Sequence, residues 1–335
     1  MNICPISIPK FNLIKCDQKI PAQKFNYELK ADTVSFSGKN KKTPNMQSHD
    51  KIGTQFGREF YSMLNENYTV PEILEKLNET ETDLTIKDIE ELRALSINPI
   101  YYRAFFNSKL KGDFIPKDMQ LYLRLNEKLE TNTDKLLFAM DVAHEYTHYS
   151  QTKSGDYYNT ISEIADGDTE YGMVLAAIGD HVFTIFDTQI NNSFAYSVLK
   201  NSKFNKNGIA IPEEAYINKQ QIMNQMGMKN EAAFKKYLKG SFDAGYIETC
   251  KTIVNNPEMA DETMARVFNK LSKTPNGFDK LMSDVKKYCS LQAKRENEAR
   301  KAESNLAKKI LKSSGTINYD VFPLYYEILE EALNN

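Results

Sequence analysis

The spacing of apolar residues predicts helices over the first ordered part of the chain. Residues 50–107 carry apolar side chains at helical intervals, and Pro71 stands where a first-turn proline is expected. Thr85 with Asp88 three residues later has the form of a capping box, which predicts another helix start there. This part of the chain is therefore expected to be helical throughout.

The middle of the chain changes from a strand pattern to a helix pattern. Met119–Leu125 has apolar residues at every second position, which is typical of a half-buried strand. Thr131 can cap the strongly helical segment that follows, and Gly155 marks its end. A second helix is expected over residues 159–187, although it contains glycines.

Helices dominate again from residue 212 to the end. Pro212 is expected in the first turn of one helix, followed by acidic residues that suit the positive end of the helix dipole. Residues 278–312 predict a long charged helix, with an apolar stripe on the protein's own core and the remainder in solvent.

These patterns divide the chain into three parts and give the fold class. Residues 1–46 mix proline, lysine, asparagine and serine, and are expected to be a disordered tail or linker. Residues 47–200 contain the predicted strand and helices, and residues 201–335 form a helical C-terminal region. We therefore expect an α+β protein that is mainly helical and has a small sheet.

Composition and charge narrow the possible functions. The 335 residues carry a net charge of −2, which argues against nucleic acid as a partner. No apolar stretch is long enough to predict a membrane span. The four cysteines are widely spaced, which does not suit a disulfide framework or a zinc knuckle. Pro5 and Pro9 interrupt any apolar signal segment, so we expect a cytoplasmic protein, or one exported without a recognisable signal peptide.

The residues that carry chemistry are His144-Glu145-Tyr146-Thr147-His148, which have the pattern H-E-x-x-H. Positions four residues apart share one helix face, so His144 and His148 can hold one metal ion together. Neutral imidazoles suit zinc, and three protein ligands leave one position for water. Glu145 can then accept a proton from that water. We expect one Zn²⁺ per chain.

The order of strand, loop, H-E-x-x-H helix and second acidic helix resembles the zincin metallopeptidases, over roughly residues 115–185. The resemblance implies a zincin-like domain within residues 47–200. It also implies that the strand Met119–Leu125 lies at a sheet edge and pairs with extended peptide substrate.

The third metal ligand is less well defined by the sequence. No third histidine follows in the metzincin spacing, so the resemblance is to the gluzincin branch, where a glutamate on the next helix completes the site. Glu163 is the best match, with Asp166 as a supporting residue. Glu170 is an alternative on the same face, and Asp168 is another if the aspzincin pattern applies.

The sequence thus predicts a zinc-dependent metallopeptidase that hydrolyses peptide or protein substrates with Glu145 as general base. The alternative is a non-catalytic helical interaction protein with a zincin-like core. Of the remaining histidines, His181 is expected in the core or at a helix end, and His49 in solvent. Stabilisation of a reaction oxyanion is left open between His181 and the tyrosines Tyr157, Tyr158 and Tyr171.

Overall fold

The fold was examined in a computed structural model. The residues that it describes are 48–78, 84–89, 112–115, 120–198, 202–204, 210–212, 220, 223–224, 227–255, 262–312 and 321–334. The predicted tail of residues 1–46 lies outside these ranges. Met46–Asn335 form one compact unit, which includes both of the regions that the sequence separates at residue 200.

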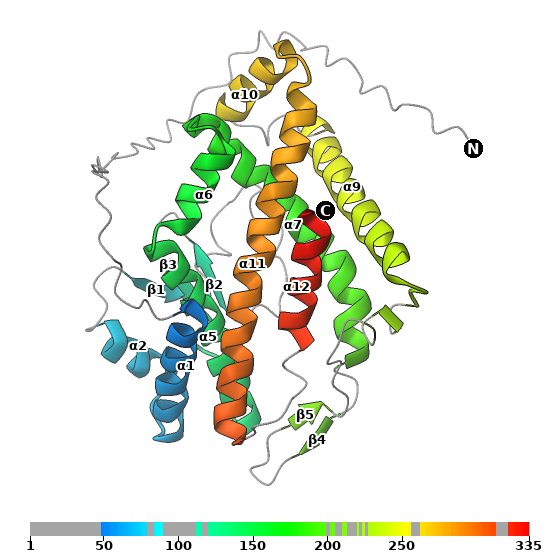
Figure 1. The fold of residues 1–335 in the computed structure, drawn as a ribbon. Coiled ribbons are helices and arrows are strands. Elements are labelled where there is room, and N and C mark those ends of the chain that lie inside the picture. The colour runs from blue at the N-terminus through cyan, green and yellow to red at the C-terminus, as the bar shows by residue number, and fades with distance from the viewer. Residues whose placement is uncertain are drawn as a thin grey trace, which may run out of the picture. The chain divides into compact units, whose positions relative to one another are not determined.

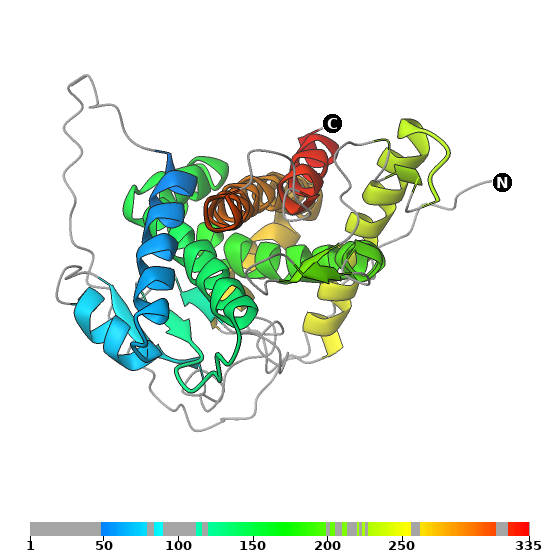
Figure 2. The same ribbon diagram turned by 90° about the horizontal axis from the view of Figure 1, so that it is seen from below.

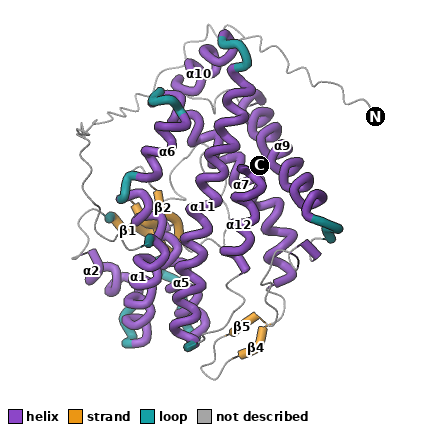
Figure 3. The backbone as a smooth tube through the Cα atoms, viewed as in Figure 1, coloured by secondary structure: helices purple, strands orange, loops and turns teal. Residues whose placement is uncertain are grey.

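The described part of the chain is mainly helical with little sheet, as predicted (Figures 1 and 3). Its helices are α1 (His49–Asn65), α2 (Val70–Asn78), α5 (Asn132–Lys153), α6 (Asp156–Ile164), α7 (Thr169–Val198), α9 (Glu231–Asn255), α10 (Glu262–Lys273), α11 (Gly277–Leu311) and α12 (Val321–Asn334). Its strands are β1 (Thr85–Asp88), β2 (Gly112–Ile115), β3 (Gln120–Leu123), β4 (Ser202–Phe204) and β5 (Ala210–Pro212). Among these helices, none is both long and apolar enough to cross a membrane.

The predicted strand is present as β3, but it is not an edge strand. The sheet has the order β1-β3-β2, with β3 parallel to β1 and antiparallel to β2. Both hydrogen-bonding sides of β3 are therefore occupied by neighbouring strands. The expectation that this strand pairs with substrate is wrong for the described residues Gln120–Leu123.

Two other local predictions are overturned by pairing between strands. Residues Thr85–Asp88 form strand β1 rather than a capping box, because each pairs with a residue of β3, and helical structure begins only at Ile89. Pro212 ends strand β5, where it lies opposite Ser202, and is not in a first helical turn. In both places pairing with another strand decides the conformation and overrides the local signal for a helix start.

The helix predicted over residues 159–187 is two helices, α6 and α7. Asp166 and Gly167 separate them, with φ angles of 53° and 76° in the left-handed region. Glycine adopts this conformation without strain, and it ends a helix readily. Asp168 then caps α7, since its Oδ1 accepts a hydrogen bond of 3.1 Å from the backbone N–H of Tyr171.

Helix α5 begins where the sequence predicts and is buried on most sides. Thr131 and Asp134 form a capping box, with hydrogen bonds of 2.9 and 3.1 Å between each side chain and the other's backbone N–H. Phe138 of α5 packs with Phe60 of α1, with Leu123 of β3 and with Leu306 of α11 in one apolar cluster. The helix is thus fixed between α1, the sheet and α11.

Helix α11 confirms the predicted long helix but not its expected exposure. It contacts α1, α5, α7 and α12, and in Figure 2 its orange ribbon lies between the blue, green and red ones. Several of its polar side chains are buried as a result, among them Asp284, Arg295 and Glu303. Buried charges need partners, and α5 supplies one for Arg295 and one for Glu303.

Contact between α1 and α5 depends on a glycine. A Cβ atom at Gly53 would overlap the Thr147 hydroxyl and lie 2.6 Å from the carbonyl oxygen of Ala143. We expect Gly53→Ala to lower the free energy of unfolding by about 1–3 kcal/mol, because the two helices must separate. Urea unfolding followed by circular dichroism measures this.

The matched control for this prediction is Gly240→Ala in α9. A Cβ at Gly240 meets nothing within 4 Å, so the better helix propensity of alanine is expected to add up to about 1 kcal/mol. Equal effects of the two substitutions would contradict the close approach at Gly53.

Candidate metal centre

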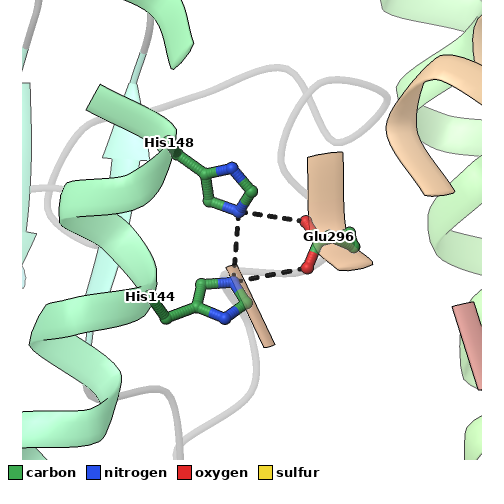
Figure 4. A group of neighbouring side chains, drawn as sticks. All are labelled: His144, His148 and Glu296. Carbon is green, nitrogen blue, oxygen red and sulfur yellow. Dashed lines mark hydrogen bonds and ion pairs between the residues drawn. The ribbon is translucent and has the colours of Figure 1, made fainter. Parts of the chain in front are cut away.

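His144 and His148 lie on one face of α5 and point at the same space, as their spacing predicts (Figure 4). Both side chains are buried. Their Nε2 atoms are 3.1 Å apart. Two ring nitrogens at this distance can bind one ion between them.

Glu296 of α11 completes the group from the opposite side (Figure 4). One carboxylate oxygen lies 3.3 Å from Nε2 of His144, and the other lies 3.2 Å from Nε2 of His148. Its placement follows from the packing of α11 against α5. Among the described residues, these three are the ones whose ligand atoms come together in this way.

The structure does not bring Glu163, Glu170 or Asp168 to the two histidines. Glu163 is exposed near the end of α6. The Glu170 carboxylate pairs with Arg266 at 2.7 Å, and that of Asp168 pairs with Lys270 at 2.6 Å. The expected third ligand on the next helix disagrees with this arrangement, because α11 rather than α6 supplies the carboxylate that faces both imidazoles.

The outer nitrogens of both histidines face acceptors. Nδ1 of His148 lies 3.0 Å from Oε1 of Gln151, which also accepts from Nε of Arg295 at 3.3 Å. Nδ1 of His144 lies 2.7 Å from Oε1 of Glu303, as an ion-pair contact rather than an aligned hydrogen bond. A neutral imidazole carries one ring proton, and an acceptor beside Nδ1 favours that proton on Nδ1. The lone pair of Nε2 is then directed at the centre.

Two carboxylates, of the buried Glu303 and the partly buried Glu296, make the centre attractive to positive charge. Burial and Arg300 lower the pKa of His144, but Glu303 and Glu296 outweigh them and raise it to about 10. Burial raises the pKa of Glu296, yet the two histidines hold it well below its ordinary value. Glu303 is itself paired with Arg300 at 2.8 Å. The same negative potential that favours protons at the imidazoles favours a metal cation in their place.

The donor set suits zinc. Zinc–nitrogen and zinc–carboxylate bonds of about 2.0–2.2 Å place neighbouring ligand atoms about 3.3–3.5 Å apart in a tetrahedron. The two Nε2 atoms are 3.1 Å apart, and the two oxygens of Glu296 lie 3.3 Å from His144 and 3.2 Å from His148, so the donor atoms are grouped slightly more closely than around a bound ion. Two neutral imidazoles and one carboxylate are also a ligand set that catalytic zinc uses. The residues present therefore fit this metal.

Glu145 lies beside the group without belonging to it. Its Oε1 is 3.9 Å from Nε2 of His144, and its side chain is 13% exposed. A carboxylate at this position can reach a water molecule at the centre and remains connected to solvent. This geometry suits a general base, whose carboxylate must lie within hydrogen-bond reach of the proton that it accepts, directly or through one water.

The other candidates from the sequence have partners elsewhere. His181 is buried in the core and lies 2.8 Å from the Thr249 hydroxyl, in agreement with its expected place. His49 is not a solvated tail residue, since it begins α1 and its Nδ1 lies 2.9 Å from the Ser150 hydroxyl. The hydroxyl of Tyr171 donates to Asp284 at 2.9 Å.

Tyr157 and Tyr158 differ in their surroundings. The buried Tyr157 hydroxyl lies 2.7 Å from that of Tyr288, whereas Tyr158 is 47% exposed.

Sequence reasoning missed Glu296, Glu303 and Gln151. Glu296 and Glu303 are seven residues apart, so they share one face of α11, and Gln151 follows His148 by three residues on α5. These spacings are visible in the sequence. They identify a site only once α11 is known to pack on α5.

Comparison of the chain with protein-family models, with curated proteins and with solved structures gives no match. The resemblance to zincins therefore depends on the H-E-x-x-H motif and the elements around it. Assignment of function depends on the chemistry of the centre itself.

A pair of substitutions tests the third ligand. We expect Glu296→Gln to weaken zinc binding at least a hundredfold, because even partners that only support a ligand contribute about 10–100-fold. Titration with a zinc-responsive chelating dye measures the affinity.

The control is Glu163→Gln, which removes the same charge from the exposed side of α6. Its affinity for zinc is expected to equal that of the unaltered protein. Loss of zinc in the Glu163 variant, with retention in the Glu296 variant, would return the third ligand to the sequence-based assignment.

Proposed function

We propose that the protein is a zinc-dependent metallopeptidase, with His144, His148 and Glu296 as metal ligands. The observation that supports the proposal most is the position of Glu145, whose carboxylate lies 3.9 Å from a ligand nitrogen while staying outside the ligand group. A purely structural zinc site is normally closed by four protein ligands. Three candidate ligands beside a free carboxylate are what a hydrolytic site requires.

The proposed chemistry divides between the ion and the chain. When bound, zinc would acidify a water molecule and polarise the substrate carbonyl. Glu145 accepts the proton of the attacking water and then delivers it to the amine that leaves. Gln151 accepts a hydrogen bond from Nδ1 of His148, and the negative charge of Glu303 beside Nδ1 of His144 favours a proton there, so both Nε2 atoms are directed inward.

The H-E-x-x-H motif and the resemblance to zincins are the reasons for proposing that the substrates are peptides. Because β1 and β2 flank β3, an extended peptide has to bind elsewhere than along Gln120–Leu123. Among the described strands, β1 and β2 lie at the two edges of this sheet. Strand addition at one of them remains compatible with the proposal.

Two measurements test the proposed function. The purified protein is analysed for metal content, and it is then incubated with a mixed fluorogenic peptide library before and after treatment with a chelator. We expect one zinc per chain, cleavage that stops on chelation, and recovery on addition of zinc. Stoichiometric zinc with no cleavage of any peptide would instead favour the non-catalytic interaction protein.

A further inference from the structure

One face of α11 extends from the candidate metal centre to a second polar group. Tyr288, Gln292 and Glu296 follow one another at intervals of four residues, so they share a face of the helix. Gln292 is about 6 Å from Glu296 along the helix axis. Side chains near Gln292 are therefore within reach of a peptide bound at the metal centre.

Helix α7 brings a carboxylate to this face. Gly179 allows close approach, since a Cβ there would overlap the ring of Tyr288. The next residue, Asp180, directs Oδ1 at two donors on α11. The Tyr288 hydroxyl and the Gln292 amide each donate to it at 2.6 Å. Asp180 is thus fixed in place on the same side of α11 as Glu296.

Asp180 retains capacity for a cationic partner. Its side chain is exposed, and within the described ranges no lysine or arginine forms an ion pair with it. The charge of Arg295 lowers the pKa of Asp180, but the Arg295 guanidinium donates its hydrogen bonds to Gln292 and Gln151 rather than to Asp180. Among the described residues, the hydrogen bonds to Asp180 go to Oδ1, which leaves Oδ2 for another donor.

The electrostatic surroundings agree with this. Although water reaches the Asp180 side chain, desolvation by the surrounding protein raises the pKa of its carboxyl, and Glu296 raises it further. The hydrogen bonds from Tyr288 and Gln292 and the positive charge of Arg295 lower the pKa. A positive group from a ligand would stabilise the ionised form that these donors hold.

We propose that Asp180 is a specificity residue that binds a positively charged group of the peptide substrate. This inference rests on the proposed peptidase function and adds a substrate preference to it. Two sources share the required chemistry, namely a lysine or arginine side chain and the N-terminal ammonium of the peptide. Each offers N–H donors to Oδ2 in a charge-assisted hydrogen bond.

The test uses the Asp180→Asn variant, in which Oδ1 remains an acceptor for Tyr288 and Gln292 while the negative charge is lost. Fluorescent peptides of one length carry lysine, norleucine or glutamate at a single position, each with a free or an acetylated N-terminus. Binding is measured by anisotropy in zinc-loaded protein with Glu145→Gln, so that no cleavage intervenes, and kcat/KM is measured with Glu145 intact.

We expect the unaltered chain to prefer a cationic peptide by about 10–100-fold over its neutral counterpart, as for hydrogen bonds to charged groups. In Asp180→Asn the preference falls to about one, while the neutral peptide binds as before. If replacing lysine by norleucine removes the preference, the lysine side chain is the group that binds Asp180. If acetylation removes it, the group is the N-terminal ammonium. Asp156→Asn, on the exposed start of α6, removes the same charge and should preserve the preference.

Failure of this inference and failure of the proposed function give different results. Cleavage that ignores peptide charge, or a preference that persists in Asp180→Asn, overturns the role of Asp180 and leaves the peptidase assignment intact. Charge-selective binding that depends on Asp180, without cleavage of any peptide, keeps the binding site and overturns the peptidase assignment. The peptide series on the unaltered chain tests the preference even if the variant unfolds.

Discussion

Replacement of Glu145 by glutamine is expected to leave zinc content at one per chain and to lower kcat/KM by about 10²–10⁴-fold. The amide keeps the size of the side chain but cannot accept a proton from the attacking water. Retention of zinc follows because the ligand group of His144, His148 and Glu296 does not include Glu145. Elemental analysis and the fluorogenic peptide assay, performed on the same preparation, measure both quantities.

The control is Glu130→Gln, an exposed carboxylate that precedes α5. Its activity should match that of the unaltered protein. If Glu145→Gln retains peptidase activity, Glu145 is not the general base, and if it loses zinc, the assignment of ligands has to be revised.

The second large effect is expected in the double variant His144→Ala with His148→Ala. Zinc content should fall from one per chain to background, because Glu296 alone offers too few ligand atoms. The unaltered protein should unfold at a higher temperature with zinc than with chelator, since a ligand at about a hundred times its Kd adds about 2.7 kcal/mol. The double variant should show no such difference.

His49→Ala is the matched control for the double variant. His49 is bonded to Ser150 and lies outside the ligand group, so zinc and its stabilising effect should persist. Stoichiometric zinc in the double variant would overturn the proposed centre.

The parts of the fold that the sequence predicts are those decided by neighbours along the chain. Thr131 with Asp134 defines the start of α5 through two short-range hydrogen bonds. The alternation in residues 120–123 predicts β3 as a strand, but not its burial on both faces, since Leu121, Tyr122 and Leu123 are all buried. The histidines meet because one helical turn brings them together.

The parts that it misses depend on distant partners. Thr85–Asp88 carries a capping signal, but pairing with β3 makes it a strand. The same pairing puts β3 in the middle of the sheet, which no pattern within Met119–Leu125 indicates. The carboxylate that faces both histidines follows the same rule. Glu163 lies at the spacing that the zincin resemblance implies, whereas the packing of α11 on α5 brings Glu296 to the histidines.

The contribution of α11 to the metal centre has a consequence for how the protein is made. Ribosomes complete the histidine pair about 150 residues before they add Glu296, a delay of roughly 7–30 s at typical elongation rates. During that interval the nascent chain contains the two histidines but not yet Glu296. Once α11 docks, an ion held by all three residues would connect parts of the chain that lie about 150 residues apart in the sequence. We therefore expect zinc to bind late in folding and, by binding only the folded state, to stabilise the packing of α11 against α5.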